Sequence, residues 1–143
     1  MSNTKPLALV TGVGPGTGAS VVRRFAEGGY RVGMIARDAD RLAALENEIP
    51  DSIALPCDVS DADALKQAID SVGAPKVVVH NAVGGAFGTF SQIDAEVLQR
   101  NFEINTMALF HLARLTTPPM IAAGEGAVVV TRNTSAQRRP GAF

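Results

Sequence analysis

A glycine-rich turn near the start of the chain constrains the possible folds more than any other feature. It follows a short apolar stretch, residues 7–10, and precedes a segment whose apolar residues Val21, Val22 and Phe25 fall on one side of a helix. The turn reads Thr11-Gly12-Val13-Gly14-Pro15-Gly16-Thr17-Gly18. The predicted order is therefore a buried strand, a sharp turn and a helix.

Such a turn can hold a nucleotide. Glycine adopts positive φ angles and lets the atoms of another molecule approach the backbone closely. The start of a helix offers free N–H groups and partial positive charge to a phosphate. A glycine turn also occurs as a plain connection that binds nothing, so the pattern needs its context. No lysine follows Gly18 directly, as a P-loop would require, which disfavours a mononucleotide triphosphatase.

Length and composition limit the other classes of protein. The 143 residues are expected to form one domain, 1–143, and the net charge of −1 gives no reason to expect nucleic acid or an anionic membrane as a partner. No apolar run reaches the length of a membrane span. The single cysteine, Cys57, excludes an internal disulfide and fits a cytoplasmic location. It has no neighbours at metal-ligand spacing, so we expect a buried thiol and no metal site.

Short apolar runs alternate with amphipathic stretches along the whole chain. The runs are continuous rather than alternating, as in a parallel sheet covered on both faces. We predict strands over residues 7–11, 31–36, 53–56, 76–80 and 127–131. We predict helices over residues 16–27, 40–48, 61–71 and 94–122. This order gives an α/β fold with right-handed crossovers and a ligand site at the carboxyl ends of the strands.

Several of the predicted helices have recognisable ends. Asp61 and Asp94 are expected to be N-caps, and Gly28-Gly29 and Gly73 are expected to stop helices at their C-termini. We expect Pro118-Pro119 to end or kink the longest helix.

The loop after the second predicted strand bears on the choice of dinucleotide. A fold that selects NAD usually places an acid here to bind the ribose hydroxyl. This chain has Ala36 followed by Arg37, whose guanidinium suits the 2′-phosphate of NADP. Alternatively, Arg37 is a solvated residue and Asp38 supplies the acid one position later. We favour NADP.

The loops after the third and fourth predicted strands carry further candidates. Asp58 could accept a hydrogen bond from an adenine amino group while Val59 packs on the ring. Alternatively, Asp58 or Ser60 could be only a helix cap. In the next loop the Asn81 amide can pin neighbouring loops, and the small residues around Ala82 leave room for a flat ring and a ribose.

The two histidines are interpreted as structural residues. His80 ends an apolar strand, which favours a core histidine with satisfied hydrogen bonds over an acid–base group. His111 lies beside Phe110 and Leu112 and is expected to pack or to lie at the surface.

Together these motifs resemble the short-chain dehydrogenase/reductase superfamily. The matching features are the TG-x-x-x-G-x-G turn, Arg37, Asp58-Val59, Asn81-Ala82-x-Gly84, and Asn105 within Asn101-Phe102-Glu103-Ile104-Asn105. Two departures are His80, where the family usually has Asn, and Val83, where a smaller residue is common. The resemblance implies a Rossmann-type, doubly wound parallel sheet of about five strands in the order 3-2-1-4-5, truncated before the family's last strands and helices. It also implies an NADP site made by Thr11, Gly12, Gly14, Gly16, Thr17, Gly18, Arg37, Asp58, Val59, Asn81, Ala82 and Val83.

The family's catalytic residues match less completely. The resemblance implies hydride transfer between a nicotinamide and a carbonyl or alcohol, with a Tyr as the acid–base group, a Lys four residues later, a Ser that orients the substrate oxygen, and a helix Asn that holds a water. Asn105 matches that Asn, and Ser135 is the candidate Ser, with Asn133 and Thr134 as alternatives at the same position. The sequence has no Tyr-x-x-x-Lys, and its one tyrosine, Tyr30, falls at the opposite edge of the predicted sheet. We therefore expect a chain that binds the cofactor but is inactive on its own.

Two functions other than an oxidoreductase also use a glycine-rich first turn. A non-catalytic NADP-binding module, acting as a sensor or as a partner of another chain, would use the same pocket. An S-adenosylmethionine methyltransferase also has a glycine-rich first loop, but it normally needs an acid after the second strand, where this chain has Arg37.

The surface is expected to favour self-association. The predicted strand at residues 127–131 would be an open sheet edge, and the helix over residues 94–122 has more apolar residues than this chain can cover. We expect a homo-oligomer, a dimer through that helix or that edge.

Overall fold

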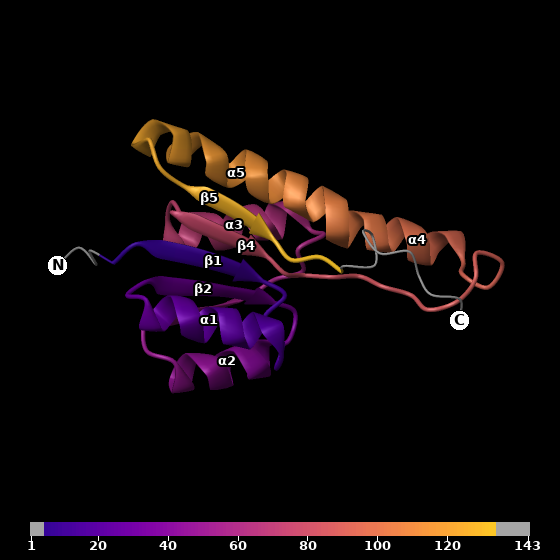
Figure 1. Ribbon diagram of the computed structural model, residues 1–143, viewed down its shortest axis with the longest axis horizontal. Coiled ribbons are helices and arrows are strands. Elements are labelled where there is room, and N and C mark those ends of the chain that lie inside the picture. Colours follow the sequence, from indigo (N-terminus) through magenta and orange to yellow (C-terminus); the bar gives the residue numbers. More distant parts are fainter. Residues whose placement is uncertain (1–4, 134–143) are drawn as a thin grey trace.

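The predicted strands form one parallel sheet. In the computed structural model, which describes residues 5–133, the strand order is β3-β2-β1-β4-β5, which confirms the expected Rossmann-type topology (Figure 1). The strands are β1 (Leu7–Thr11), β2 (Arg31–Ala36), β3 (Ser52–Pro56), β4 (Val77–His80) and β5 (Ala127–Val130). All pairings are parallel, so Thr11 lies beside Ile35 on one side and His80 on the other. The carboxyl ends of the strands consequently meet at one edge of the sheet.

Helices cover both faces of the sheet. They are α1 (Thr17–Glu27) and α2 (Ala39–Glu48) on one face, and α3 (Ala62–Val72) and α5 (Ala108–Ala123) on the other (Figure 1). Successive strand residues point to opposite faces, so Leu9 joins the core under α3 and α5 while Val10 joins the core under α1 and α2. All of β1 is buried, which explains its continuous apolar sequence.

The predicted helix ends are largely confirmed. The Asp61 carboxylate caps α3 by accepting hydrogen bonds from the N–H groups of Asp63 and Ala64, at 3.1 and 3.0 Å. Gly73 ends α3 with a φ of +91°, a left-handed angle that favours glycine. Asp94 precedes the next helix without a side-chain cap hydrogen bond.

The longest predicted helix is interrupted by a π turn. It consists of α4 (Ala95–Phe102), the π-helical turn η1 (Glu103–Met107) and α5, in direct succession. The prolines do not end it, because α5 continues through Pro118 and Pro119 to Ala123. Thr116 and Met120 flank the prolines and are buried, so packing on the sheet maintains the helical path across them.

Apolar surface remains exposed on two elements. None of the α4 residues is buried, and Leu98 and Phe102 are 67% and 54% exposed. β5 pairs with β4 at one edge of the sheet, and its Val129 and Val130 are also exposed. Within residues 5–133, no helix combines the length and the apolar character needed to cross a membrane.

Candidate functional site

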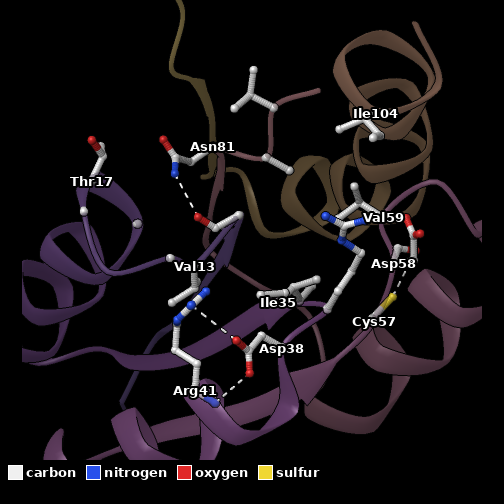
Figure 2. Close-up of a pocket in the computed structure, with 18 residues that line it drawn as sticks. Val13, Thr17, Ile35, Asp38, Arg41, Cys57, Asp58, Val59, Asn81 and Ile104 are labelled. Carbon is white, nitrogen blue, oxygen red and sulfur yellow. Dashed lines mark hydrogen bonds and ion pairs between the residues drawn. The ribbon is translucent and has the colours of Figure 1, made fainter. Parts of the chain in front are cut away.

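A cavity of about 600 Å³ lies at the carboxyl ends of the strands. This volume is in the range of small-molecule binding sites. In Figure 2, Thr17 and Asn81 lie on one side of the hollow, and Asp58 and Val59 lie on another. The lining residues are Gly12, Val13, Gly14, Gly16, Thr17, Gly18, Ile35, Ala36, Arg37, Asp38, Arg41, Cys57, Asp58, Val59, Asn81, Ala82, Val83 and Ile104.

Two glycines of the first turn are required by the fold itself. Gly12 has a φ of +69°, and a Cβ placed on it would lie 2.4 Å from the backbone nitrogen of Ala82. A Cβ on Gly18 would lie 2.4 Å from the carbonyl oxygen of Gly12. These close approaches bring the turn against the loop after β4 and against the start of α1.

Two other glycines of the turn face open space. A Cβ on Gly14 or Gly16 would meet no atom within 4 Å, and neither residue has a positive φ. Gly16 is also the N-cap of α1, and it provides no side-chain cap, while the first turn of the helix has no acidic residue. This leaves the positive end of the α1 dipole open to an anion in the cavity. The open start of α1 and the free space beside Gly14 and Gly16 therefore fit the phosphates of a dinucleotide.

Thr11 and Asn81 fix the two loops that form this end of the cavity. The buried Thr11 hydroxyl oxygen accepts hydrogen bonds from the backbone N–H groups of Asn81 and Ala82, at 3.2 and 3.3 Å. The Asn81 amide donates to the carbonyl of Gly12 at 3.0 Å and accepts from the hydroxyl of Thr131 at 2.8 Å. Asn81 thus pins neighbouring loops, as its position in the sequence predicts.

His80 is a buried histidine with both ring nitrogens satisfied. Its Nε2 lies 3.1 Å from the carbonyl oxygen of Ile104, and its Nδ1 lies 2.9 Å from the Thr11 hydroxyl. A carbonyl can only accept, so Nε2 carries the hydrogen and Nδ1 accepts from the hydroxyl. Burial lowers the pKa of His80, although the Ile104 carbonyl partly opposes the shift. His80 is a structural residue, and it ties β4 to the π turn.

Asp58 is held from two directions at the rim of the cavity. Its Oδ1 accepts hydrogen bonds from the N–H and the hydroxyl of Ser60, at 3.0 and 2.7 Å, and its Oδ2 lies 2.6 Å from Nη2 of Arg100. Burial alone would raise the pKa of Asp58, but the Ser60 hydrogen bonds and the Arg100 guanidinium hold it below its usual value. The cap of α3 is Asp61, so the alternative of Asp58 as a helix cap is wrong.

The loop after β2 and the first turn of α2 each present an arginine to the cavity. Arg41 is held by Asp38, whose Oδ1 accepts from the Arg41 N–H at 3.0 Å and whose Oδ2 lies 3.3 Å from the Arg41 guanidinium. Figure 2 shows this pair at the bottom of the hollow. Arg37 also lines the cavity, is exposed, and makes no ion pair with any residue in the range 5–133.

Cys57 lines the cavity as a buried, protonated thiol. Burial raises its pKa to about 11, with smaller contributions from Asp58 and Asp61. A thiol with this pKa is a weak nucleophile at neutral pH. The predicted structural role of Cys57 agrees with this environment.

Asn105, the catalytic candidate among residues 5–133, does not line the cavity. The Asn105 side chain makes two reciprocal hydrogen bonds with the backbone of Gly84, at 2.9 and 2.8 Å, and so fixes the loop after β4 to the π turn. Ser135 and Thr134 lie outside the described residues. Tyr30 packs on Phe25 just before β2, at the opposite edge of the sheet, as predicted.

The structure brings together almost all of the residues predicted for cofactor binding. All of them line the cavity except Thr11. The Thr11 hydroxyl instead accepts a hydrogen bond from the backbone of the loop after β4. Their binding of a cofactor stays a prediction. Ile35, Arg41 and Ile104 also line the cavity, and none of them was predicted from the sequence as a site residue. Arg41 could have been found, because an N-cap Asp followed three residues later by an Arg is a recognisable pair.

The chain belongs to the short chain dehydrogenase family, whose pattern matches residues 6–142. It is 34% identical over 132 residues to D-erythrulose reductase of Gallus gallus and 30% identical over 132 residues to L-xylulose reductase of Bos taurus. Each match covers 92% of this chain and 54% of the relative, so the chain spans about half the length of these curated relatives.

Two solved structures that resemble this chain hold different dinucleotides. A metagenomic short-chain oxidoreductase in complex with NADP matches with a TM-score of 0.83 and 32% identity, over 87% of this chain and 61% of that one. A 3-oxoacyl-(acyl-carrier protein) reductase from Brucella melitensis with bound NAD matches with a TM-score of 0.88 and 26% identity, over 96% of this chain and 57% of that one. The comparisons therefore do not distinguish NAD from NADP as the cofactor of this chain.

Alanine substitutions at Gly12 and Gly14 should separate fold from binding. Gly12→Ala forces a Cβ against backbone and should lower the free energy of unfolding by about 2 kcal/mol or more. Gly14→Ala should leave thermal stability unchanged and weaken binding of a nicotinamide dinucleotide by roughly tenfold or more, because the Cβ takes up the ligand's space. Thermal unfolding and calorimetric titration measure the two effects. A Gly14→Ala protein that binds as tightly as the parent would contradict the assignment.

The buried His80 should make stability depend on pH. Because its pKa is lower in the folded than in the unfolded state, the unfolded chain binds more protons below about pH 6.5, and the free energy of unfolding should fall as pH decreases from there. One proton limits this slope to about 1.4 kcal/mol per pH unit. Denaturant unfolding between pH 5 and 7.5 should show a shallower slope in His80→Asn than in the parent. Equal slopes in the parent and His80→Asn would refute the assignment.

Proposed function

We propose that this chain binds NADP(H) and supplies the cofactor site of an oxidoreductase that transfers a hydride between the nicotinamide and a carbonyl or alcohol. The observation that carries the proposal is the cavity itself, at the carboxyl ends of adjacent strands. It brings together the open glycines of the first turn and Arg37, which makes no ion pair within residues 5–133. Membership of the short chain dehydrogenase family supports the reaction class. The names of the relatives D-erythrulose reductase and L-xylulose reductase support a carbonyl substrate.

The charges around β2 favour NADP over NAD. The residue that ends β2 is Ala36, so no carboxylate stands at the position that would repel a 2′-phosphate. Asp38, the alternative acid, is occupied by the backbone and the guanidinium of Arg41. Arg37 can therefore take the 2′-phosphate in a bidentate contact.

Each part of the cofactor has a set of residues that would hold it. The open backbone at Gly14 and Gly16 and the start of α1 would bind the pyrophosphate, while Asp58 and Val59 would bind the adenine. The small residues after β4, fixed by Asn105, would support the nicotinamide ribose. The nicotinamide supplies the hydride.

Turnover needs residues that these 143 positions do not include. The sequence has no Tyr-x-x-x-Lys, so we propose that a chain of this sequence alone binds the cofactor without turnover. The reaction of the whole protein is therefore proposed from its membership of the family. A non-catalytic NADP-binding module stays the alternative, and a reducing, cytoplasmic location is proposed from the single cysteine.

Calorimetric titration with NADPH and NADH tests the proposal. The parent should bind NADPH more tightly than NADH, and Arg37→Ala should weaken NADPH binding by roughly tenfold to a hundredfold while leaving NADH binding unchanged, since it removes a charged hydrogen bond to the 2′-phosphate. Arg24→Ala, at the far end of α1, is the control. Equal affinities of the parent for both cofactors would contradict NADP selectivity, and binding of neither would contradict the proposed function.

The exposed face of α4 supports the proposed dimer. Leu98 and Phe102 lie one helical turn apart and are both more than half exposed, so we propose that they pack against α4 of a second copy. Leu98→Glu should convert a dimer to a monomer in sedimentation velocity, and Gln99→Glu on the same helix should not. A parent that stays monomeric at high concentration would contradict this interface, and a dimer that survives Leu98→Glu would favour the edge of β5.

A further inference from the structure

Arg100 connects α4 to the loop that follows β3. Its Nη2 donates to Oδ2 of Asp58 at 2.6 Å and its Nη1 donates to the hydroxyl of Ser60 at 2.7 Å, across 42 and 40 residues of sequence. Oε2 of Glu103 also lies 3.6 Å from Nη1. Arg100 does not line the cavity, whereas Asp58 does, so Arg100 can affect a ligand through the Asp58 carboxylate.

The contacts of Asp58 leave one direction free for a ligand. Oδ1 accepts two hydrogen bonds from Ser60 and has no further lone pair to offer. Oδ2 accepts one hydrogen bond from Arg100 and keeps a second lone pair. With both oxygens held, the carboxylate cannot rotate freely, and its remaining acceptor position is fixed relative to the cavity.

We propose that Arg100 is a positioning residue that makes this site selective for a 6-aminopurine over a 6-oxopurine. The inference rests on the proposed function, in which Asp58 and Val59 hold the base of the cofactor. An ionised carboxylate only accepts hydrogen bonds, so it attracts an exocyclic amino group and repels an exocyclic carbonyl. Arg100 and Ser60 set the direction of that carboxylate.

A merely structural role for Arg100 would have a different signature. If the guanidinium served only to attach α4 to the sheet, its loss would weaken binding of every ligand equally, or of none. If it positions the Asp58 carboxylate, its loss should affect ligands with a 6-amino group and spare those with a 6-oxo group. Base discrimination therefore separates the two roles.

The experiment compares NADPH with its reduced hypoxanthine analogue by calorimetric titration. The parent should bind NADPH about tenfold more tightly than the analogue, and Arg100→Gln should lose most of this ratio by weakening NADPH binding alone. Arg100→Lys keeps the charge but loses the bidentate contact, so it should give an intermediate ratio of the two affinities. Arg114→Gln, on the exposed side of α5, is the matched control and should keep the parent's ratio.

Asp58→Asn completes the test, because its amide can donate to a 6-oxo group and should reduce or reverse the preference. An unchanged ratio in Arg100→Gln and Arg100→Lys, or equal weakening of both ligands, would overturn the positioning role while leaving the proposed function intact. Failure of the parent to bind NADPH would instead refute the proposed function, and this inference with it. Thermal unfolding of each variant verifies that it is folded before titration.

Discussion

The hydroxyl of Thr11 is the contact on which the site depends. It lies at the end of β1, accepts hydrogen bonds from the backbone N–H groups of Asn81 and Ala82, and donates one to Nδ1 of His80. His80 in turn donates to the carbonyl of Ile104 in the π turn. One buried hydroxyl therefore joins the first turn, the loop after β4 and the helix that carries Asn105. A buried network of this kind is rigid when every member is satisfied, as here.

The four glycines of the first turn divide into two pairs with different physical reasons. Gly12 and Gly18 are needed because backbone atoms of the chain itself lie where a Cβ would be. Gly14 and Gly16 face empty space, so nothing in the chain demands a small residue there. Space beside a backbone, next to the open start of a helix, is what a bound phosphate requires. The second pair is therefore explained by a ligand, and the first pair by the fold.

The sequence predicted the regular elements because their signals are local. Continuous apolar runs marked the strands, and the observed ends of β1 to β5 and of the helices agree with the predicted ends to within one residue, apart from the division of the long helix. The π turn was not predicted, because one extra residue in a helical ladder barely alters the apolar periodicity. The Arg100 contact was not predicted either, since Asp58 lies 42 residues away and only the crossover of the chain brings the two together. Local chemistry thus identified the cavity lining, while the residues that hold the lining in place depend on tertiary structure.

The charges around the cavity show why the supporting residues matter. Two carboxylates, Asp38 and Asp58, stand at its rim, and each would repel a polyanionic ligand if left alone. Each is instead paired with an arginine, Arg41 and Arg100 respectively. Among the described residues that line the cavity, this leaves Arg37 as the arginine without an ion pair. The positive charge available to a ligand is thereby concentrated beside the end of β2, where the second ribose of a dinucleotide lies in this class of fold.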